Sequence, residues 1–169
     1  MMKKALYACL MAASVVMLSA TAASAQGKVR LTARLNGGEE TPAPGLNTGA
    51  FGFAVVTVDS AAAEVLVELQ VWNLPTGSTA GHIHAGSKGT PGPVILDFTF
   101  PQGLSGDFSQ TFRLGQSALR ARPEIGINTL ADALQAVAAG NGYVNVHTTQ
   151  YAGGEIRGQL VPDGSQGQQ

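Results

Sequence analysis

Short segments in which apolar and polar side chains alternate with a period of two dominate this chain and most narrow its possible fold. In KVRLTARL, residues 28–35, Val29 and Leu31 fall on one side while Arg30 and Thr32 fall on the other. Successive side chains of a strand point to opposite faces, so this pattern predicts a strand with one apolar face. Similar segments predict strands at 50–59, 63–74, 80–85, 93–100, 106–114, 142–149 and 154–162.

A helical period occurs in one region, near 115–139. NTLADALQAVAAGNG places four apolar residues on one helical face, with Asn128 or Thr129 as N-cap and Gly140 at the end. The segment 115–122 favours a second, shorter helix. About eight short strands with one short crossover helix region predict an all-β fold, an antiparallel Greek-key sandwich or barrel. We expect the helix to cover one open end.

The N-terminus has the pattern of an export signal. Lys3 and Lys4 precede an apolar run from Ala5 to Leu18, and the small-residue motif at 23–25 then predicts cleavage before Gln26. The alternative, a membrane anchor, needs about 20 uninterrupted apolar residues, and this run is shorter. The predicted organisation is a cleaved signal peptide at 1–25, one β domain at 26–162 and a disordered polar tail at 163–169.

The charge composition limits the classes of binding partner, and the cysteine content limits the possible disulfides. Without Lys3 and Lys4 the chain has eight basic and eleven acidic residues, and no basic run. Nucleic acid and anionic membranes require clustered Lys and Arg, so neither is expected as a partner, and no membrane span remains after cleavage. The one cysteine, Cys9, falls in the predicted signal, so no disulfide is expected. We expect a secreted or periplasmic protein whose protein or surface partner the sequence does not name.

The three histidines are the candidate metal ligands. His82 and His84 alternate with Ile83 on one strand and therefore share a face, about 6.6 Å apart at their α-carbons. His147 lies on the predicted strand 142–149 and shares a face with Asn145. If the two strands are neighbours, three imidazoles meet in a set that suits copper or zinc and leaves a position open. Asp97 and Glu155 are candidate fourth ligands.

Other interpretations of these residues stay open. The histidines can instead hydrogen-bond to loop carbonyls and hold the Gly-rich turn at 86–92. Glu155 and Arg157 share a strand face, where Arg157 either guides an anion to the histidines or, as we favour, joins a surface ladder of charges. The pair Glu39 and Glu40 binds a cation or, more commonly, lies in a solvated loop.

Three blocks of the chain resemble the CHRD domain, named from chordin and common in exported bacterial proteins. They are LNGGEETPAP with TGAFGF, AGHIHAGSKGTPGPVILDF and GYVNVHTTQYAGGEIRGQL, and the likeness runs from Val29 to Leu160. The resemblance implies a secreted all-β domain without a defined biochemical role.

A weaker likeness is to the barrel of Cu/Zn superoxide dismutase. It implies that His82 and His84 match paired copper ligands, His147 a later ligand and Arg157 the arginine near the copper channel. The chain has no bridging histidine and no cysteine pair, so the two-metal site of that family is not assembled. We therefore expect a non-catalytic binding or structural module with one copper or zinc ion. The alternatives are a metal-free protein-interaction module and a dismutase-like redox enzyme.

Overall fold

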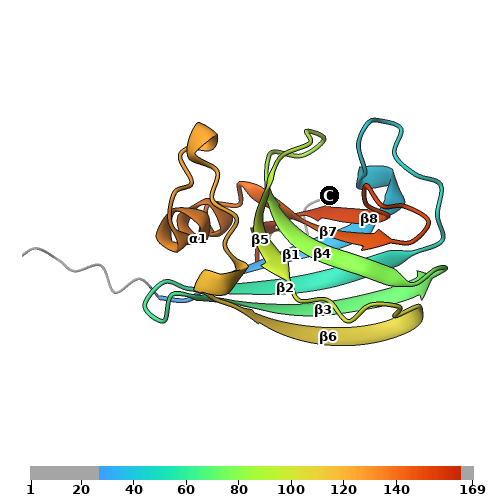
Figure 1. The fold of residues 1–169 in the computed structure, drawn as a ribbon, viewed down its shortest axis with the longest axis horizontal. Coiled ribbons are helices and arrows are strands. Elements are labelled where there is room, and N and C mark those ends of the chain that lie inside the picture. The colour runs from blue at the N-terminus through green and yellow to red at the C-terminus, as the bar shows by residue number, and fades with distance from the viewer. Residues whose placement is uncertain (1–26, 165–169) are drawn as a thin grey trace, which may run out of the picture.

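The computed structural model describes residues 27–164, which form one antiparallel sheet and a short helix (Figure 1). The predicted signal peptide at 1–25 and residues 165–169 of the predicted tail lie outside the described residues. Asp163, which we placed in the tail, still belongs to the domain, since its amide donates to Arg30. The strands are β1 Val29–Asn36, β2 Phe51–Asp59, β3 Glu64–Leu74, β4 Ser78–Ala85, β5 Val94–Phe98, β6 Gly106–Leu114, β7 Gly142–Thr148, β8 Ile156–Gln159 and β9 Val161–Pro162.

The sheet curls into a nearly closed barrel. Its strand order is β5-β4-β7-β8-β1-β2-β3-β6, and β9 pairs with β1. Side chains join the two edge strands, because the rings of Phe98 on β5 and Phe112 on β6 stack with centroids 4.9 Å apart. The predicted antiparallel barrel is confirmed. The predicted strand 154–162 is divided into β8 and β9. The amide of Leu160, between them, donates to the Gly142 carbonyl, and β9 then pairs with β1.

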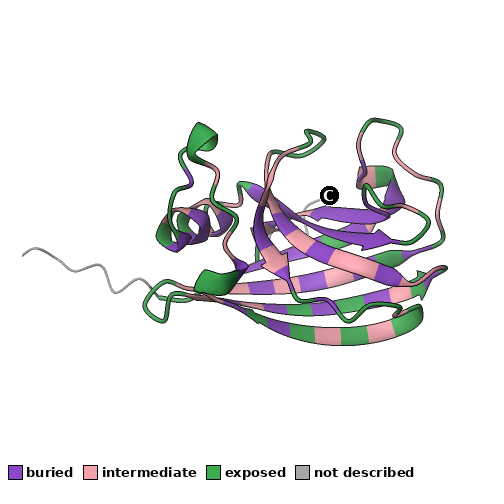
Figure 2. Ribbon diagram, viewed as in Figure 1, coloured by how far each residue is buried: buried purple, intermediate pink, exposed green. Residues whose placement is uncertain are grey.

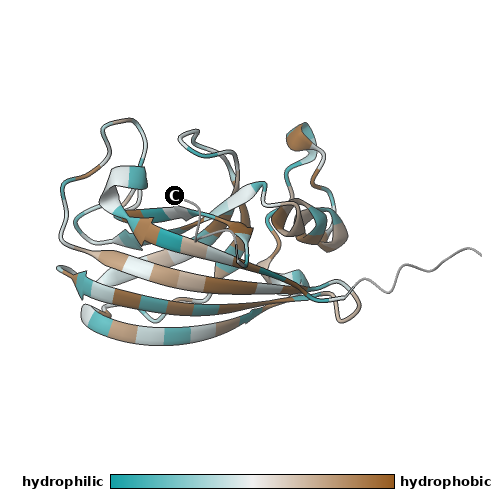
Figure 3. Ribbon diagram, turned by 180° about the vertical axis from the view of Figure 1, so that it is seen from behind, coloured by the Kyte–Doolittle hydropathy of each residue, from teal (hydrophilic) through white to brown (hydrophobic). Residues whose placement is uncertain are grey.

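Alternation along the strands builds the core. Residues such as Leu31, Val56 and Val67 point into the barrel and are fully buried, while their neighbours point outward. In Figure 3 brown and teal bands alternate along part of β3, whereas β2 is brown to white over most of its length. On a strand such as β2 every second residue faces the core, and these residues are apolar because the core excludes water.

Helix α1, Leu130–Ala138, lies at one end of the barrel (Figure 1). Thr129, one of the two N-caps that the sequence offered, is the N-cap, and it forms a capping box with Asp132. The apolar residues of the helix join the barrel core: Leu130, Ala133, Leu134 and Val137.

The shorter helix predicted at 115–122 is wrong. The structure has only two 3-10 turns in this region, Gln116–Ala118 and Pro123–Ile125. Between them Leu119 forms a β-bridge with Leu96, and the Arg120 amide donates to the Ile95 carbonyl. The segment thus extends the edge of β5, and pairing with that strand replaces the helical hydrogen bonds.

Strand β7 is buried on both faces. Every residue from Gly142 to Thr148 is buried, and the strand is purple throughout in Figure 2. One face, with Val144, packs in the barrel core, whereas the other carries Tyr143, Asn145 and His147. The loops 37–50, 86–93 and 149–155 contact this polar outer face through hydrogen bonds. A polar site is therefore built on the outside of the barrel and covered by loops.

The burial of Glu40 shows that these covering loops exclude solvent. We expected Glu39 and Glu40 to form a solvated pair, but Glu40 is only 8% exposed and accepts a hydrogen bond from Asn145 Nδ2. The expectation is wrong for Glu40, because the loop 37–50 folds back over β7 and β8. Glu39 stays half-buried and pairs with Lys88.

Candidate metal centre

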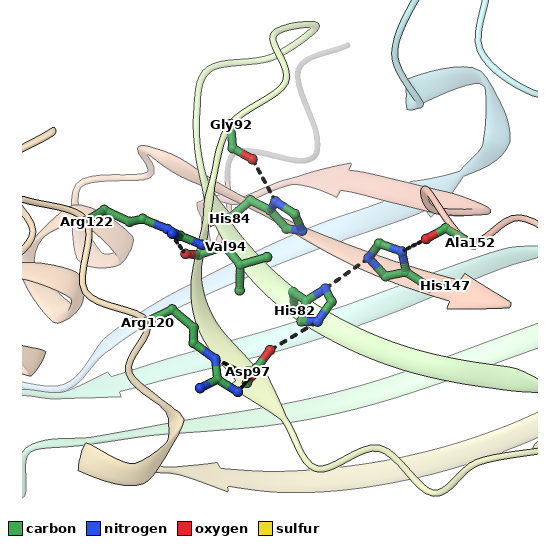
Figure 4. Close-up of polar contacts among 9 residues, drawn as sticks. All are labelled: His82, His84, Gly92, Val94, Asp97, Arg120, Arg122, His147 and Ala152. Carbon is green, nitrogen blue, oxygen red and sulfur yellow. Dashed lines mark hydrogen bonds and ion pairs between the residues drawn. The ribbon is translucent and has the colours of Figure 1, made fainter. Parts of the chain in front are cut away.

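Two neighbouring strands bring the three histidines together. Strands β4 and β7 pair antiparallel, with His82 opposite Asn145 and Ala80 opposite His147. His147 is therefore diagonal to His82, on the face that also carries His84. One ring nitrogen of each histidine lies within 4.8 Å of the others (Figure 4). The strand pairing that the sequence left as a condition for a shared site is present.

Hydrogen bonds to acceptors outside the cluster fix the tautomer of each ring. His84 Nδ1 lies 2.8 Å from the Gly92 carbonyl oxygen, and His147 Nδ1 lies 2.9 Å from the Ala152 carbonyl oxygen. A carbonyl oxygen only accepts, so both Nδ1 atoms carry the proton. His82 Nε2 lies 3.1 Å from Asp97 Oδ1 and donates to this carboxylate. The three remaining nitrogens carry lone pairs.

These lone pairs face one another. His82 Nδ1 is 2.9 Å from His147 Nε2, and after the outer hydrogen bonds neither nitrogen has a proton to share. His84 Nε2 is buried and has no hydrogen-bond partner among residues 27–164. Facing lone pairs at this distance repel, and a buried acceptor without a donor is unfavourable. A cation bound between the three nitrogens removes both penalties.

The surroundings keep the rings neutral. Burial, with repulsion from His147 next, lowers the pKa of His82 from its ordinary value of 6.5 to about 4. Burial also lowers the pKa of His84 and of His147. Metal ions bind the deprotonated imidazole, so all three rings are in the ligating form at neutral pH.

Asp97 lies behind His82 and outside the group of three histidines. Its carboxylate holds the outer nitrogen of His82 and is itself paired with the Arg120 guanidinium. We had considered Asp97 a fourth ligand, but within the described residues the ligand group contains the three histidines alone. A carboxylate behind a metal-ligating imidazole fixes the ring and raises its basicity. In the sheet Asp97 lies opposite His82, and this pairing is invisible in the sequence.

The glycine-rich turn fixes His84. The Gly92 carbonyl accepts from His84 and from the Tyr143 hydroxyl, whose ring stacks on His84 with centroids 4.7 Å apart. A Cβ on Gly92 would lie 1.7 Å from the Ala85 carbonyl oxygen, so only glycine fits there. The interpretation of the histidines as anchors of this turn is thus correct for His84. The anchoring leaves its other nitrogen free for a metal.

Glu155 and Arg157 are buried, so a surface ladder of charges is wrong. Glu155 is fully buried, and both its oxygens accept from threonine hydroxyls, those of Thr48 and Thr148. Arg157 is 2% exposed and lies with its guanidinium 3.4 Å from the centroid of the Tyr143 ring. The folded loops over β7 and β8 exclude these two side chains from solvent.

Arg157 ties the covering loops together. Its Nη2 donates to the Ser87 and Thr90 carbonyls, and its Nη1 donates to the Thr41 hydroxyl. Sequence reasoning expected loop carbonyls as partners of the histidines but could not say which ones, because a backbone acceptor leaves no side-chain signal. It also missed Arg120, which the wrong helix prediction placed on a separate element.

Together the fold and the site define a class: small antiparallel β-barrel modules whose outer face carries a loop-covered cluster of three histidines. The CHRD domain family model matches residues 31–160. The chain belongs to the CHRD-domain family, as its sequence blocks indicated. Neither curated proteins nor solved structures gave a match. No helix within residues 27–164 is long and apolar enough to cross a membrane.

Proposed function

We propose that this domain is an exported module that binds one copper or zinc ion through His82, His84 and His147. The convergence of three proton-free ring nitrogens, each held by an acceptor behind the ring, carries this proposal. Hydrogen bonds alone would place a donor between His82 and His147, and neutral rings held in these tautomers supply none. The metal would be bound by imidazole alone, with a further position left for water or another ligand.

Export is supported by the family and by the N-terminal sequence. CHRD domains occur in extracellular or exported proteins, and residues 1–25 have the composition of a signal peptide. The described residues provide a single group of metal-ligating side chains, so a two-metal dismutase centre has no support from them. We propose a binding role without catalysis.

Calorimetric titration with Zn(II) and with Cu(II) tests the proposal. We expect one ion per chain for the wild type and no measurable binding for the His82→Ala, His84→Ala double variant. Gln150→Ala, an exposed change beside β7, is the matched control and should leave affinity unchanged. Equal affinity of the wild type and the double variant would refute the site.

Nitrogen NMR of the imidazoles gives a sharper test, because the chain has only three histidines. On addition of Zn(II) we expect shifts typical of metal binding at Nδ1 of His82 and at Nε2 of His84 and His147. The other three nitrogens should keep their protons, held by Asp97, Gly92 and Ala152. Metal binding through His82 Nε2 would contradict the tautomers derived from the structure.

A further inference from the structure

Three arginines surround the histidine cluster. Arg120 pairs with Asp97 directly behind His82. Arg122 donates through Nε to the carbonyl of Val94, which lies opposite His84 in the sheet (Figure 4). Two guanidinium charges therefore lie directly behind the strand that carries Asp97 and Val94, next to His82 and His84.

Arg157 approaches from the other side of Tyr143. Its guanidinium lies 3.4 Å from the centre of the Tyr143 ring, whose plane is only 12° from that of His84. Two groups this close to one ring occupy opposite faces, so Arg157, Tyr143 and His84 form a stack.

Nearby carboxylates compensate only part of the positive charge of these three arginines. Asp97 brings a carboxylate against the histidine cluster, at His82 Nε2. Glu40 lies near Arg157, but burial raises its pKa to about 7, so it is only partly ionised at neutral pH. The ligands add no charge, because all three are neutral imidazoles. Glu155 is a further carboxylate in this region, held by the hydroxyls of Thr48 and Thr148. Three guanidinium groups thus face Asp97, Glu155 and the partly ionised Glu40, which leaves a small excess of positive charge before any ion enters.

The charge of the ion decides how strongly this environment opposes binding. Coulomb repulsion scales with the product of the charges, so each arginine opposes a divalent ion twice as strongly as a monovalent one. Zn(II) also completes a tetrahedral shell, so at this site it would take water as a fourth ligand beside the three histidines. A monovalent ion bound by the three nitrogens meets half the repulsion and needs no fourth ligand.

We propose that the ion selected by this site is Cu(I), in preference to Zn(II) and Cu(II). This inference rests on the proposed metal-binding function and adds the oxidation state of the ion. The neutral ligand set supplies the bonds, and the surrounding arginines discriminate against the second positive charge.

Competition titrations measure the preference. Cu(I) is titrated without oxygen against the chromophoric chelator bicinchoninate, and Zn(II) and Cu(II) against chelators of known affinity. All samples carry Cys9→Ala, since a thiol outside the site would bind Cu(I). We expect the dissociation constant for Cu(I) to be at least about 100-fold below that for Zn(II), and below that for Cu(II).

Two charge variants test whether the charges around the histidines cause the preference for Cu(I). Arg120→Gln removes a positive charge and should raise Zn(II) affinity about threefold to tenfold relative to Cu(I), as expected for one charge about 10 Å away. Asp97→Asn removes a negative charge and should shift the ratio in the opposite direction. Arg30→Gln, on the pair with Asp163, should leave the ratio unchanged.

The outcomes separate the two proposals. Binding of Zn(II) or Cu(II) more tightly than Cu(I) overturns the Cu(I) inference and leaves the three-histidine site in place. Ratios that move in the same direction in Arg120→Gln and Asp97→Asn also overturn it. Absence of binding for all three ions refutes the proposed function itself.

Discussion

Replacement of Glu40 by glutamine should make the protein more stable at pH 8 and leave its stability unchanged at pH 4. Burial raises the pKa of Glu40 from its ordinary value of 4.5 to about 7, although Arg157 and the Asn145 hydrogen bond act in the opposite direction. The folded state therefore keeps a proton that the unfolded chain has already released. The stability that goes with this proton is complete below pH 4.5 and is lost as the pH rises to about 7.

The difference of about 2.5 between the two pKa values corresponds to about 3.4 kcal/mol. A small cavity lined by Glu40, Thr41 and Gly154 admits solvent beside the carboxylate and screens part of this penalty. We therefore expect Glu40→Gln to raise the free energy of unfolding by about 2 kcal/mol at pH 8. Glutamine keeps an oxygen that accepts from Asn145 Nδ2, so the substitution imitates the protonated acid.

Urea unfolding of the metal-free wild type and of Glu40→Gln at each unit from pH 4 to pH 8 gives the difference profile. Glu39→Gln is the matched control, because Glu39 is adjacent, half-buried and paired with Lys88 at the surface. The difference for Glu40→Gln should rise between pH 4.5 and pH 7 and then level off. A flat profile, or a variant less stable than the wild type at pH 8, would refute the reasoning.

Three further changes test the barrel and the site. Gly92→Ala, which puts a Cβ 1.7 Å from the Ala85 carbonyl oxygen, should lower the melting temperature and weaken metal binding at least tenfold, whereas Gly153→Ala, in open space, should do neither. Phe112→Ala opens the β5–β6 contact and should lower the free energy of unfolding by about 3 to 5 kcal/mol in urea titrations. Folding lowers the pKa of His82 to about 4. The free energy of unfolding of the metal-free wild type should therefore fall as the pH falls from 6.5 through 4, and His82→Gln should show a smaller fall. A pH profile of His82→Gln identical to that of the wild type would contradict this expectation.

Much of the fold could be predicted because strand formation here follows from nearest-neighbour alternation. The predicted segments at 50–59, 63–74 and 106–114 match β2, β3 and β6 almost residue for residue. The capped helix was predictable for the same reason, since Thr129 and Asp132 act within one turn. The helix prediction at 115–122 was wrong because Leu119 is used in a bridge to Leu96, a partner that no local pattern reveals.

The candidate site depended on contacts between distant segments. The sequence identified His82, His84 and His147 by residue type and by their shared strand faces. It offered Asp97 only as a fourth ligand, not as the partner behind His82, and it did not identify the particular carbonyls of Gly92 and Ala152 or Arg120 and Arg122. These groups reach the histidines only through the pairing of β4 with β5 and β7 and through the folded loops.

The sequence alone determined the strands, the helix and the face on which each histidine lies, because these depend on the direction of each side chain relative to its own backbone. Only the tertiary structure decided that the outer face of β7, Glu40 and Arg157 are buried, and that the lone pairs of the three histidines converge. Burial and convergence depend on which segments pack against one another over more than 60 residues of chain, as for His82 and His147, which are 65 residues apart. Packing of this range is a property of the closed barrel and not of any one segment.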